Sequence, residues 1–149
     1  SLASNNDQAP WYIVQISDPQ LGFIEKNKSI EQETILLKKA IQKINSLQPE
    51  ILVITGDFVN SSHNIEQIKK FKELCHLISH EILLYKVPGN HDIGNSCNKE
   101  NVDFYNAQYG VLIHFKLLSI GSLKGVDSAN KITLVKFQLI AAGNGHLLC

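Results

Sequence analysis

Three short polar segments carry the side chains best suited to chemistry, and each follows directly after an apolar run. Asp18 and Gln20 follow the first run, Asp57 follows the second, and Asn90 and His91 follow the third. Carboxylate and amide oxygens are ligands that hard divalent cations prefer, and an imidazole can gain or lose a proton near neutral pH. The residue types therefore predict a metal-dependent site with an acid–base group.

The spacing within each segment suits a shared metal site. Asp18 and Gln20 stand two residues apart, so in an extended segment both side chains would point to the same side. Asp57 has two carboxylate oxygens and can bridge two ions, while Asn90 offers a neutral carbonyl oxygen. A glycine precedes each of these two residues and lets the backbone turn tightly near the site. Two divalent ions about 3.5–4 Å apart would clamp a phosphate and activate water at neutral pH.

Simpler interpretations of these residues remain open. Asp18 precedes a proline and could merely end a strand, and a Gly-Asp pair such as the one at Asp57 is by itself more often a turn than a ligand. Asp92 could be a local turn or capping carboxylate. The order of the three segments favours the metal site over separate turns.

Other chemically interesting residues have ordinary explanations. His76 and His80 stand four apart, but no third metal ligand lies near them in sequence, so an exposed helix face is expected. Cys75 shares the apolar stripe of a predicted helix and is interpreted as a small core residue. The glycosylation sequons at Asn27 and Asn60 are interpreted as chance.

Apolar patterns predict the elements that must position these residues. Strands are expected over 11–17, where β-branched and aromatic residues dominate, and over the short apolar runs 51–55 and 82–87. A helix after Ser29, with Gln32 completing a capping box, should end before Pro49. Asn64 should cap a second helix, and a third is expected over 101–109.

The alternation of these elements predicts an α/β fold, βαβαβ with a mostly parallel sheet covered on both faces and joined by right-handed crossovers. In such a sheet the carboxyl ends of the strands lie along one edge, where ligands bind. Beyond Gly110, the segments 111–120 and 131–140 are candidates for two more strands. We expect a disordered lead over 1–10, the main domain over 11–110 and a divergent tail over 111–149.

Composition limits the partners. The chain has 149 residues with 14 basic and 14 acidic side chains, so no nucleic-acid or membrane partner is expected from bulk charge. Three cysteines without C-x-x-C spacing suit reduced thiols and a cytoplasmic location. No apolar run approaches the roughly 20 residues of a membrane span. Because methionine is absent, we expect a fragment or a processed chain, and its oligomeric state stays open.

The segments "SDPQLG", "TGDFVN" and "PGNHDIGN" resemble the three N-terminal motifs of the calcineurin-like metallophosphoesterases. The glutamine in the first motif, where most of that superfamily has histidine, and the trailing "DIGN" are similar to a branch of serine/threonine phosphatase-like members. The resemblance covers about 11–110, some two-thirds of the chain. It implies a partial calcineurin-like metallophosphoesterase fold, which is a truncated α/β/β/α sandwich.

The resemblance also implies roles for individual residues. Asp18 and Gln20 would bind the first metal, Asp57 would bridge, Asn90 would bind the second metal, and His91 would contact the phosphate and protonate the leaving oxygen. Asp92 would orient His91, as the alternative to a turn or capping role. The cofactors would be two divalent metal ions, Mn, Mg, Fe or Zn. The substrate would be a phosphorylated protein, carrying phosphoserine or phosphothreonine, or a small phosphoester.

The chain also departs from this family pattern. The second half of the family contributes three further histidines, two of them in Gly-His-x-His, whereas "GNGHLLC" has only His146. A non-catalytic truncated fragment or binding module is therefore the alternative to a phosphatase. A nuclease of the same superfamily is disfavoured by the neutral charge.

Overall fold

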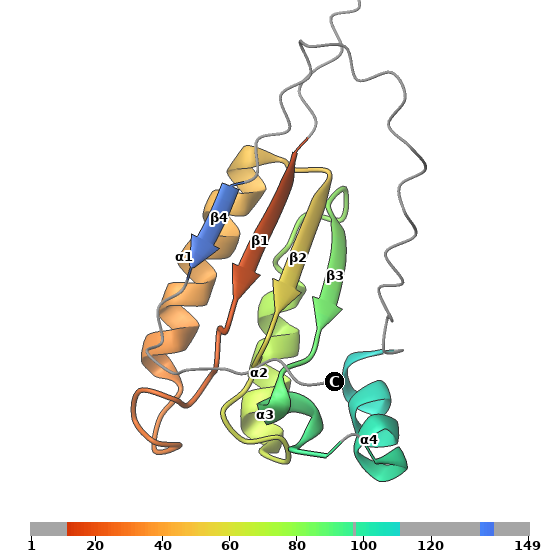
Figure 1. The fold of residues 1–149 in the computed structure, drawn as a ribbon. Coiled ribbons are helices and arrows are strands. Elements are labelled where there is room, and N and C mark those ends of the chain that lie inside the picture. The colour runs from red at the N-terminus through yellow and green to blue at the C-terminus, as the bar shows by residue number, and fades with distance from the viewer. Residues whose placement is uncertain (1–11, 97, 111–134, 139–149) are drawn as a thin grey trace, which may run out of the picture.

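A computed structural model describes residues 12–96, 98–110 and 135–138 of the chain (Figure 1). The elements follow the order β1 Ile13–Ser17, α1 Glu31–Leu47, β2 Ile51–Thr55, α2 Ile65–Cys75, β3 Leu83–Val87, α3 Asn90–Ile93, α4 Lys99–Tyr109 and β4 Val135–Gln138. The three N-terminal strands and the three longer helices match the predicted ranges to within about two residues. The four-residue helix α3 was not predicted.

The described strands form one parallel sheet in the order β3-β2-β1-β4, which confirms the α/β fold class. β4 lies inside the candidate strand 131–140. The candidate strand 111–120 and the lead over 1–10 lie outside the described residues.

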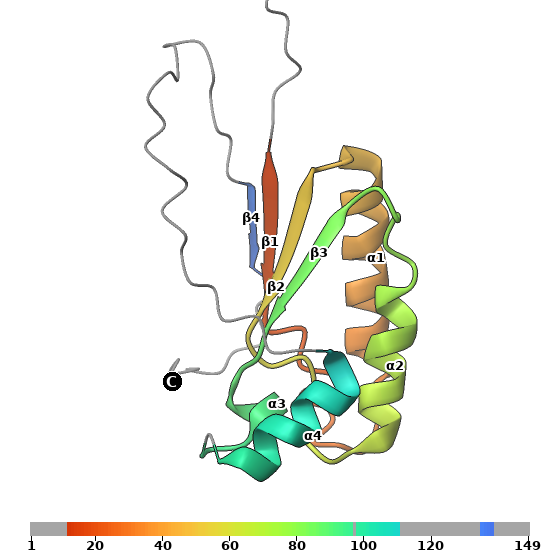
Figure 2. The same ribbon diagram turned by 90° about the vertical axis from the view of Figure 1, so that its right-hand side faces the viewer.

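Both crossover helices cover the same face of the sheet (Figure 2). The predicted cover of the other face therefore stays a prediction, since no described helix lies there. The chain steps from β1 to β2 to β3 in one direction, and two right-handed crossovers in one direction place their helices on one side. The strand side chains that point toward α1 and α2 have no solvent-exposed surface, as shown by Val14, Ile16, Leu52 and Ile54.

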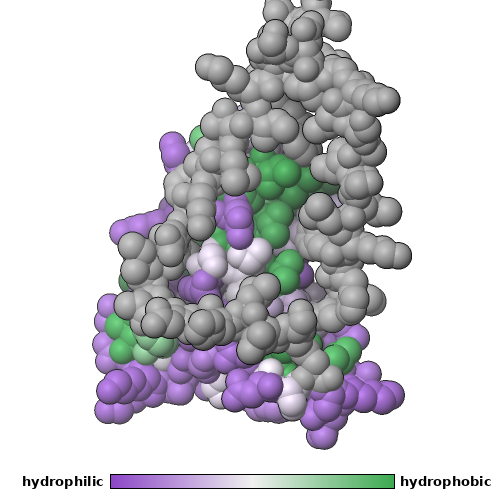
Figure 3. Space-filling model, in the orientation of Figure 1, coloured by the Kyte–Doolittle hydropathy of each residue, from purple (hydrophilic) through white to green (hydrophobic). Residues whose placement is uncertain are grey.

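The opposite face of the sheet carries apolar side chains at its visible surface. Figure 3 shows hydrophobic surface over the strands on the side away from α1 and α2. Leu83, which begins β3, is 57% exposed although it is a large apolar residue. In the part of the chain that the structure describes, no helix covers this face (Figure 2).

The helix termini test the predicted caps. Asn64 caps α2 as predicted, because its side chain accepts a hydrogen bond from the Gln67 backbone N–H. The capping box predicted at Ser29 is wrong, since α1 begins one residue later with Ile30 at the N-cap. Ser29 accepts only from the Glu31 N–H, and Gln32 donates instead to Glu25. An apolar residue at the N-cap forfeits a capping bond, which costs about 1 kcal/mol.

An aromatic cluster anchors the segment after β2 to the helices. Phe58, the residue after Asp57, is fully buried and stacks on Phe71 of α2 with ring centroids 4.7 Å apart. Tyr105 and Tyr109 of α4 pack against the same ring. This packing holds α4 beyond the C-terminal ends of the strands, beside α3 (Figures 1 and 2). None of the helices described is both long enough and apolar enough to span a membrane.

Candidate active site

The segments after β1 and β2 continue side by side beyond the sheet. The backbone N–H of Asp18 donates to the Thr55 carbonyl at 3.0 Å, and that of Gln20 donates to the Asp57 carbonyl at 2.9 Å. A parallel bridge then joins Leu21 to Val59. Backbone pairing, rather than side-chain packing alone, therefore brings the first two polar segments together, as the parallel sheet predicted.

Asp92 joins the third segment to the second. One carboxylate oxygen accepts the backbone N–H groups of Phe58 and Val59 at 2.8 and 3.2 Å, and the other accepts that of Gly89 at 2.9 Å. The side chain is 1% exposed, and this burial raises the pKa of Asp92 well above its usual value. These contacts match the capping interpretation of Asp92, and both its oxygens are committed to backbone amides rather than to the imidazole of His91.

Replacing Asp92 by asparagine should destabilise the junction. Asparagine keeps one acceptor oxygen and replaces the other by an NH₂ group. In either orientation this NH₂ group would face backbone N–H groups, that of Gly89 or those of Phe58 and Val59, so that donors would oppose each other in a buried position. An unsatisfied buried donor costs about 1–3 kcal/mol. Chemical denaturation of Asp92→Asn should show this loss; an unchanged free energy of unfolding would mean that the junction contributes little.

Asp18 and Gln20 adopt an unusual backbone conformation. Their φ angles are 54° and 37°, in the left-handed region that residues other than glycine seldom occupy. The expectation that they share one side of an extended segment is therefore wrong in its geometry. Such conformations cost about 1–3 kcal/mol each and concentrate at functional sites. The hydrogen bonds between the first two segments hold both residues in place.

The two predicted glycines are needed for close packing around the carboxylates. A Cβ atom on Gly56 would stand 2.8 Å from a carboxylate oxygen of Asp18, and Gly56 has φ +78°. A Cβ atom on Gly89 would stand only 2.1 Å from Asp57 Oδ1. Each glycine thus lets the backbone of one segment approach the carboxylate of another, as predicted.

Asp57 is the electrostatic centre of the site. It is 5% exposed, and burial raises the pKa of Asp57. Two smaller effects lower the pKa: Oδ1 accepts the backbone N–H of His91 at 2.9 Å, and a charge on His91 would attract the carboxylate. The charge of Asp18 acts in the same direction as burial and raises the pKa. A buried carboxylate with the partly buried carboxylate of Asp18 beside it favours the approach of a cation.

His91 is oriented by a backbone carbonyl. Its Nδ1 lies 2.6 Å from the carbonyl oxygen of Asn60, and a carbonyl can only accept, so Nδ1–H is the donor. Its Nε2 lies 4.0 Å from Asp57 Oδ2. Sequence reasoning missed this role of Asn60, because a main-chain contact leaves no signal in residue type.

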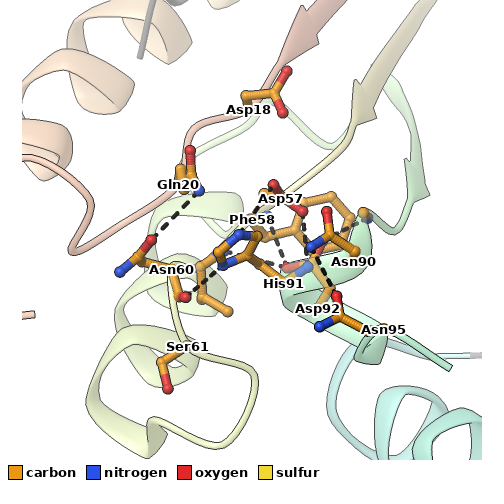
Figure 4. Close-up of polar contacts among 12 residues, drawn as sticks. Asp18, Gln20, Asp57, Phe58, Asn60, Ser61, Asn90, His91, Asp92 and Asn95 are labelled. Atoms are coloured by element: carbon orange, nitrogen blue, oxygen red, sulfur yellow. Dashed lines mark hydrogen bonds and ion pairs between the residues drawn. The ribbon is translucent and has the colours of Figure 1, made fainter. Parts of the chain in front are cut away.

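Gln20 and Asn90 both use their amide nitrogens to bind a neighbouring asparagine. Gln20 Nε2 donates to Asn60 Oδ1 at 3.4 Å, and Asn90 Nδ2 donates to Asn95 Oδ1 at 3.2 Å. Figure 4 shows these contacts as dashed lines, with the Gln20 oxygen at the opposite end of its amide, on the side of Asp18. Both carbonyl oxygens are thereby left available as ligands.

The donor set suits a hard divalent cation. Within the described ranges, no three or more His, Cys, Asp or Glu side chains are grouped to hold a metal ion. The predicted ligands are instead two carboxylates, Asp18 and Asp57, and two amides, Gln20 and Asn90. All four offer oxygen, which favours Mg²⁺ or Mn²⁺ over Zn²⁺.

The remaining candidates lie away from this site or are structural. His76 and His80 are exposed and follow the end of α2 at Cys75, so they do not share a helical face as expected. Cys75 is partly buried and packs against the core, and burial raises its pKa to about 12. A thiol with such a pKa is unreactive at neutral pH, in agreement with a core role.

Comparison with known proteins agrees with this geometry. The family model for calcineurin-like phosphoesterases matches residues 12–147, which extends beyond the 11–110 covered by the motifs. The serine/threonine-protein phosphatase CPPED1 of Danio rerio is 33% identical over 116 residues, which are 68% of this chain and 38% of that protein. Human CPPED1 is 30% identical over 118 residues, 69% of this chain and 38% of its own length.

A third relative comes from a bacterium. The UDP-2,3-diacylglucosamine pyrophosphatase LpxG of Chlamydia trachomatis is 30% identical over 134 residues, which are 90% of this chain and 35% of that protein. The chain thus spans less than two-fifths of the length of these relatives. The family match covers almost the whole chain and includes all three polar segments. On this evidence the chain belongs to the calcineurin-like phosphoesterase family.

Proposed function

We propose that this chain forms part of a metal-dependent phosphoesterase that hydrolyses phosphate monoesters at the C-terminal edge of its sheet. The observation that carries the proposal is the buried Asp57 carboxylate, which has Asp18 as a charged neighbour and His91 in contact. A buried carboxylate with a second carboxylate and an imidazole beside it destabilises the fold and is typical of catalytic sites.

The four oxygen donors would hold a dinuclear centre. Asp18 and Gln20 would hold one divalent ion, Asn90 would hold the other, and Asp57 would contribute a carboxylate to both. When bound, such ions neutralise the charge of a phosphate and activate water for attack. The protein contributes the fixed positions of the donors, through the backbone pairing of the first two segments and the Asp92 junction.

His91 would serve as the general acid. Because the Asn60 carbonyl accepts from Nδ1, the imidazole is held by one nitrogen and can present the other to a substrate. In the imidazolium form Nε2 also carries a proton, so Nε2–H can contact the phosphate and pass that proton to the leaving oxygen, which leaves a neutral ring protonated on Nδ1.

The substrate proposed is a phosphorylated protein, with phosphoserine or phosphothreonine as the reacting group. The relatives from Danio rerio and human are both named serine/threonine-protein phosphatases. A small phosphoester is the alternative substrate, since LpxG is named as a pyrophosphatase. A cytoplasmic location and the absence of nucleic-acid partners remain predictions from composition.

A metal- and phosphate-binding module without turnover is the second candidate. It is favoured by the small set of described ligands, which has only two carboxylates and includes no cluster of three His, Cys, Asp or Glu side chains among the described residues. The same oxygen set predicts weak binding, with Mn²⁺ or Mg²⁺ preferred to Zn²⁺.

Hydrolysis of p-nitrophenyl phosphate by the full chain, with and without added Mn²⁺, tests the proposal. We expect Mn²⁺-dependent turnover that is absent from Asp57→Asn. Binding of Mn²⁺ and inorganic phosphate without turnover would support the binding module instead. Failure to bind Mn²⁺ at millimolar concentration would contradict both candidates.

A further inference from the structure

Gln67 is a polar side chain buried in the helical layer. It lies on α2, is 1% exposed, and makes its contacts with loop residues rather than with the sheet. A buried amide needs hydrogen-bond partners for both its oxygen and its NH₂ group, so these partners identify the segments that Gln67 positions. Three contacts connect it to the active site through other amides, in the order Gln67, Asn27, Asn60 and Gln20, which we call the amide chain.

The direction of every contact in the amide chain follows from one backbone donor. The Ser61 N–H can only donate, and it lies 2.9 Å from Gln67 Oε1, so Gln67 must turn its Nε2 toward Asn27. Gln67 Nε2 donates to Asn27 Oδ1 at 2.8 Å, which makes that oxygen the acceptor.

The same polarity continues to the active site. Asn27 Oδ1 also accepts from Asn60 Nδ2 at 2.9 Å, which leaves Asn60 Oδ1 as the end that faces Gln20. Asn60 Oδ1 accepts from Gln20 Nε2 at 3.4 Å. The Gln20 carbonyl oxygen is therefore the end turned away from Asn60, as Figure 4 shows.

The loop before α1 is shaped around this contact. A Cβ atom on Gly22 would come within 2.2 Å of Gln67 Nε2 and 3.1 Å of Asn27 Oδ1, and Gly22 has φ +98°. Asn27 itself has φ 65°, a left-handed conformation that asparagine tolerates better than most residues. The backbone conformations of Gly22 and Asn27 thus leave room for the hydrogen bond between Gln67 and Asn27.

We infer that the amide chain fixes the orientation of Gln20, so that its carbonyl oxygen and not its NH₂ group faces Asp18. Gln67, Asn27 and Asn60 are then positioning residues. Asn60 has a double role, because its main-chain carbonyl also holds His91. The role of Gln20 as a metal ligand rests on the proposed function. The orientation of its amide does not, because it follows from hydrogen bonds within the metal-free chain.

Gln67→Glu is the most direct test. Glutamate keeps the acceptor for Ser61 N–H and nearly the same shape, but it has no N–H for Asn27. Asn27 should then turn its NH₂ toward the introduced carboxylate, and the reversal should pass through Asn60 to Gln20. Asn27→Asp is the matched control, because a carboxylate keeps the acceptor that both Gln67 and Asn60 need. Gln42→Glu, on the exposed side of α1, controls for the added charge.

Side-chain amide NOEs in the ¹⁵N-labelled, metal-free chain report the orientation. In the wild type we expect NOEs from the Gln20 NH₂ protons to the Asn60 side chain and none to the Hβ protons of Asp18. Gln67→Glu should reverse this pattern. NOEs from the wild-type Gln20 NH₂ to Asp18, or an unchanged pattern in Gln67→Glu, would overturn the inference.

Mn²⁺ titration by calorimetry reports the consequence. Gln67→Glu should weaken Mn²⁺ binding by about 10–100-fold, as is usual when a group that orients a ligand is lost. Asn27→Asp and Gln42→Glu should stay within about twofold of the wild type. Equal weakening in all three variants would indicate a general charge or folding effect and would overturn the inference. If the wild type shows the expected NOEs but binds no Mn²⁺, the orientation stands and the proposed metal function fails.

Discussion

Asp57→Asn should lose metal binding and turnover together, while its metal-free form becomes more stable than the wild type. A bridging carboxylate supplies a ligand to both ions, and asparagine removes one negative charge and one oxygen. We expect Mn²⁺ affinity to fall by about 100-fold or more and hydrolysis to become undetectable, because binding and activation of water depend on the pair of ions. Calorimetry and the p-nitrophenyl phosphate assay measure the two effects.

The gain in stability follows from the buried charge. Burial raises the pKa of Asp57, so the folded state holds this proton more tightly than the unfolded state does. The resulting contribution to stability is fully present below the unfolded pKa and is lost as the pH rises through the folded pKa. At neutral pH the ionised Asp57 therefore destabilises the metal-free fold. Asparagine avoids this cost and can still accept the His91 N–H.

Thermal unfolding in EDTA checks this sign. At pH 7 we expect Asp57→Asn to be more stable by about 1 kcal/mol, and the difference should shrink as the pH falls toward 4. A metal-free variant less stable than the wild type at pH 7 would mean that the Asp57 carboxylate contributes to folding. Retention of Mn²⁺ affinity would show that the bridging role is misassigned.

The convergence of the three polar segments could be predicted because it depends only on strand direction. Parallel strands bring their carboxyl ends to one edge, so Asp18, Asp57 and His91 meet whatever the details of their loops. Asn64 was recognisable as a cap for a similar reason, since its side chain bonds a backbone group three residues away. Local or topological rules of this kind are visible in residue types and spacing.

The features that the sequence did not reveal depend on which atoms meet across distant segments. Asp92 is a junction because it reaches the amides of Phe58 and Val59, more than 30 residues away. The orientation of His91 by Asn60 uses a main-chain oxygen, which every residue has. The left-handed backbone of Asp18 and Gln20 is imposed by neighbouring segments rather than by local preference.

The placement of the helices shows a different limit. Continuously apolar strands correctly indicated that both faces of the sheet carry apolar side chains, but not what covers each face. The order of strands along the sheet decides this, because two crossovers in the same direction put α1 and α2 together. Strand order is not encoded in the apolar pattern, so that pattern could not show that α1 and α2 share one face.

His91→Ala should retain the metal and lose the proton donor. The side chain of His91 contacts Asp57 only at 4.0 Å, and the backbone N–H that bonds Asp57 Oδ1 is kept in alanine. The metal ligands should therefore keep their positions and their Mn²⁺ affinity. General acid catalysis typically contributes about 10²–10⁴-fold, so kcat should fall by this amount for substrates with a poor leaving group.

The leaving group separates this role from simple positioning. A phosphoserine peptide releases an alkoxide that needs a proton, whereas p-nitrophenolate leaves without one, so the loss in kcat should be largest for the peptide and smallest for the aryl ester. His80→Ala, an exposed histidine outside the site, is the control and should match the wild type for both substrates. Equal slowing of the two substrates by His91→Ala would assign His91 to phosphate positioning, and loss of Mn²⁺ would make it a ligand. Either result would contradict the general-acid role, because a proton donor acts on the bond that breaks and not on the ions that hold the phosphate.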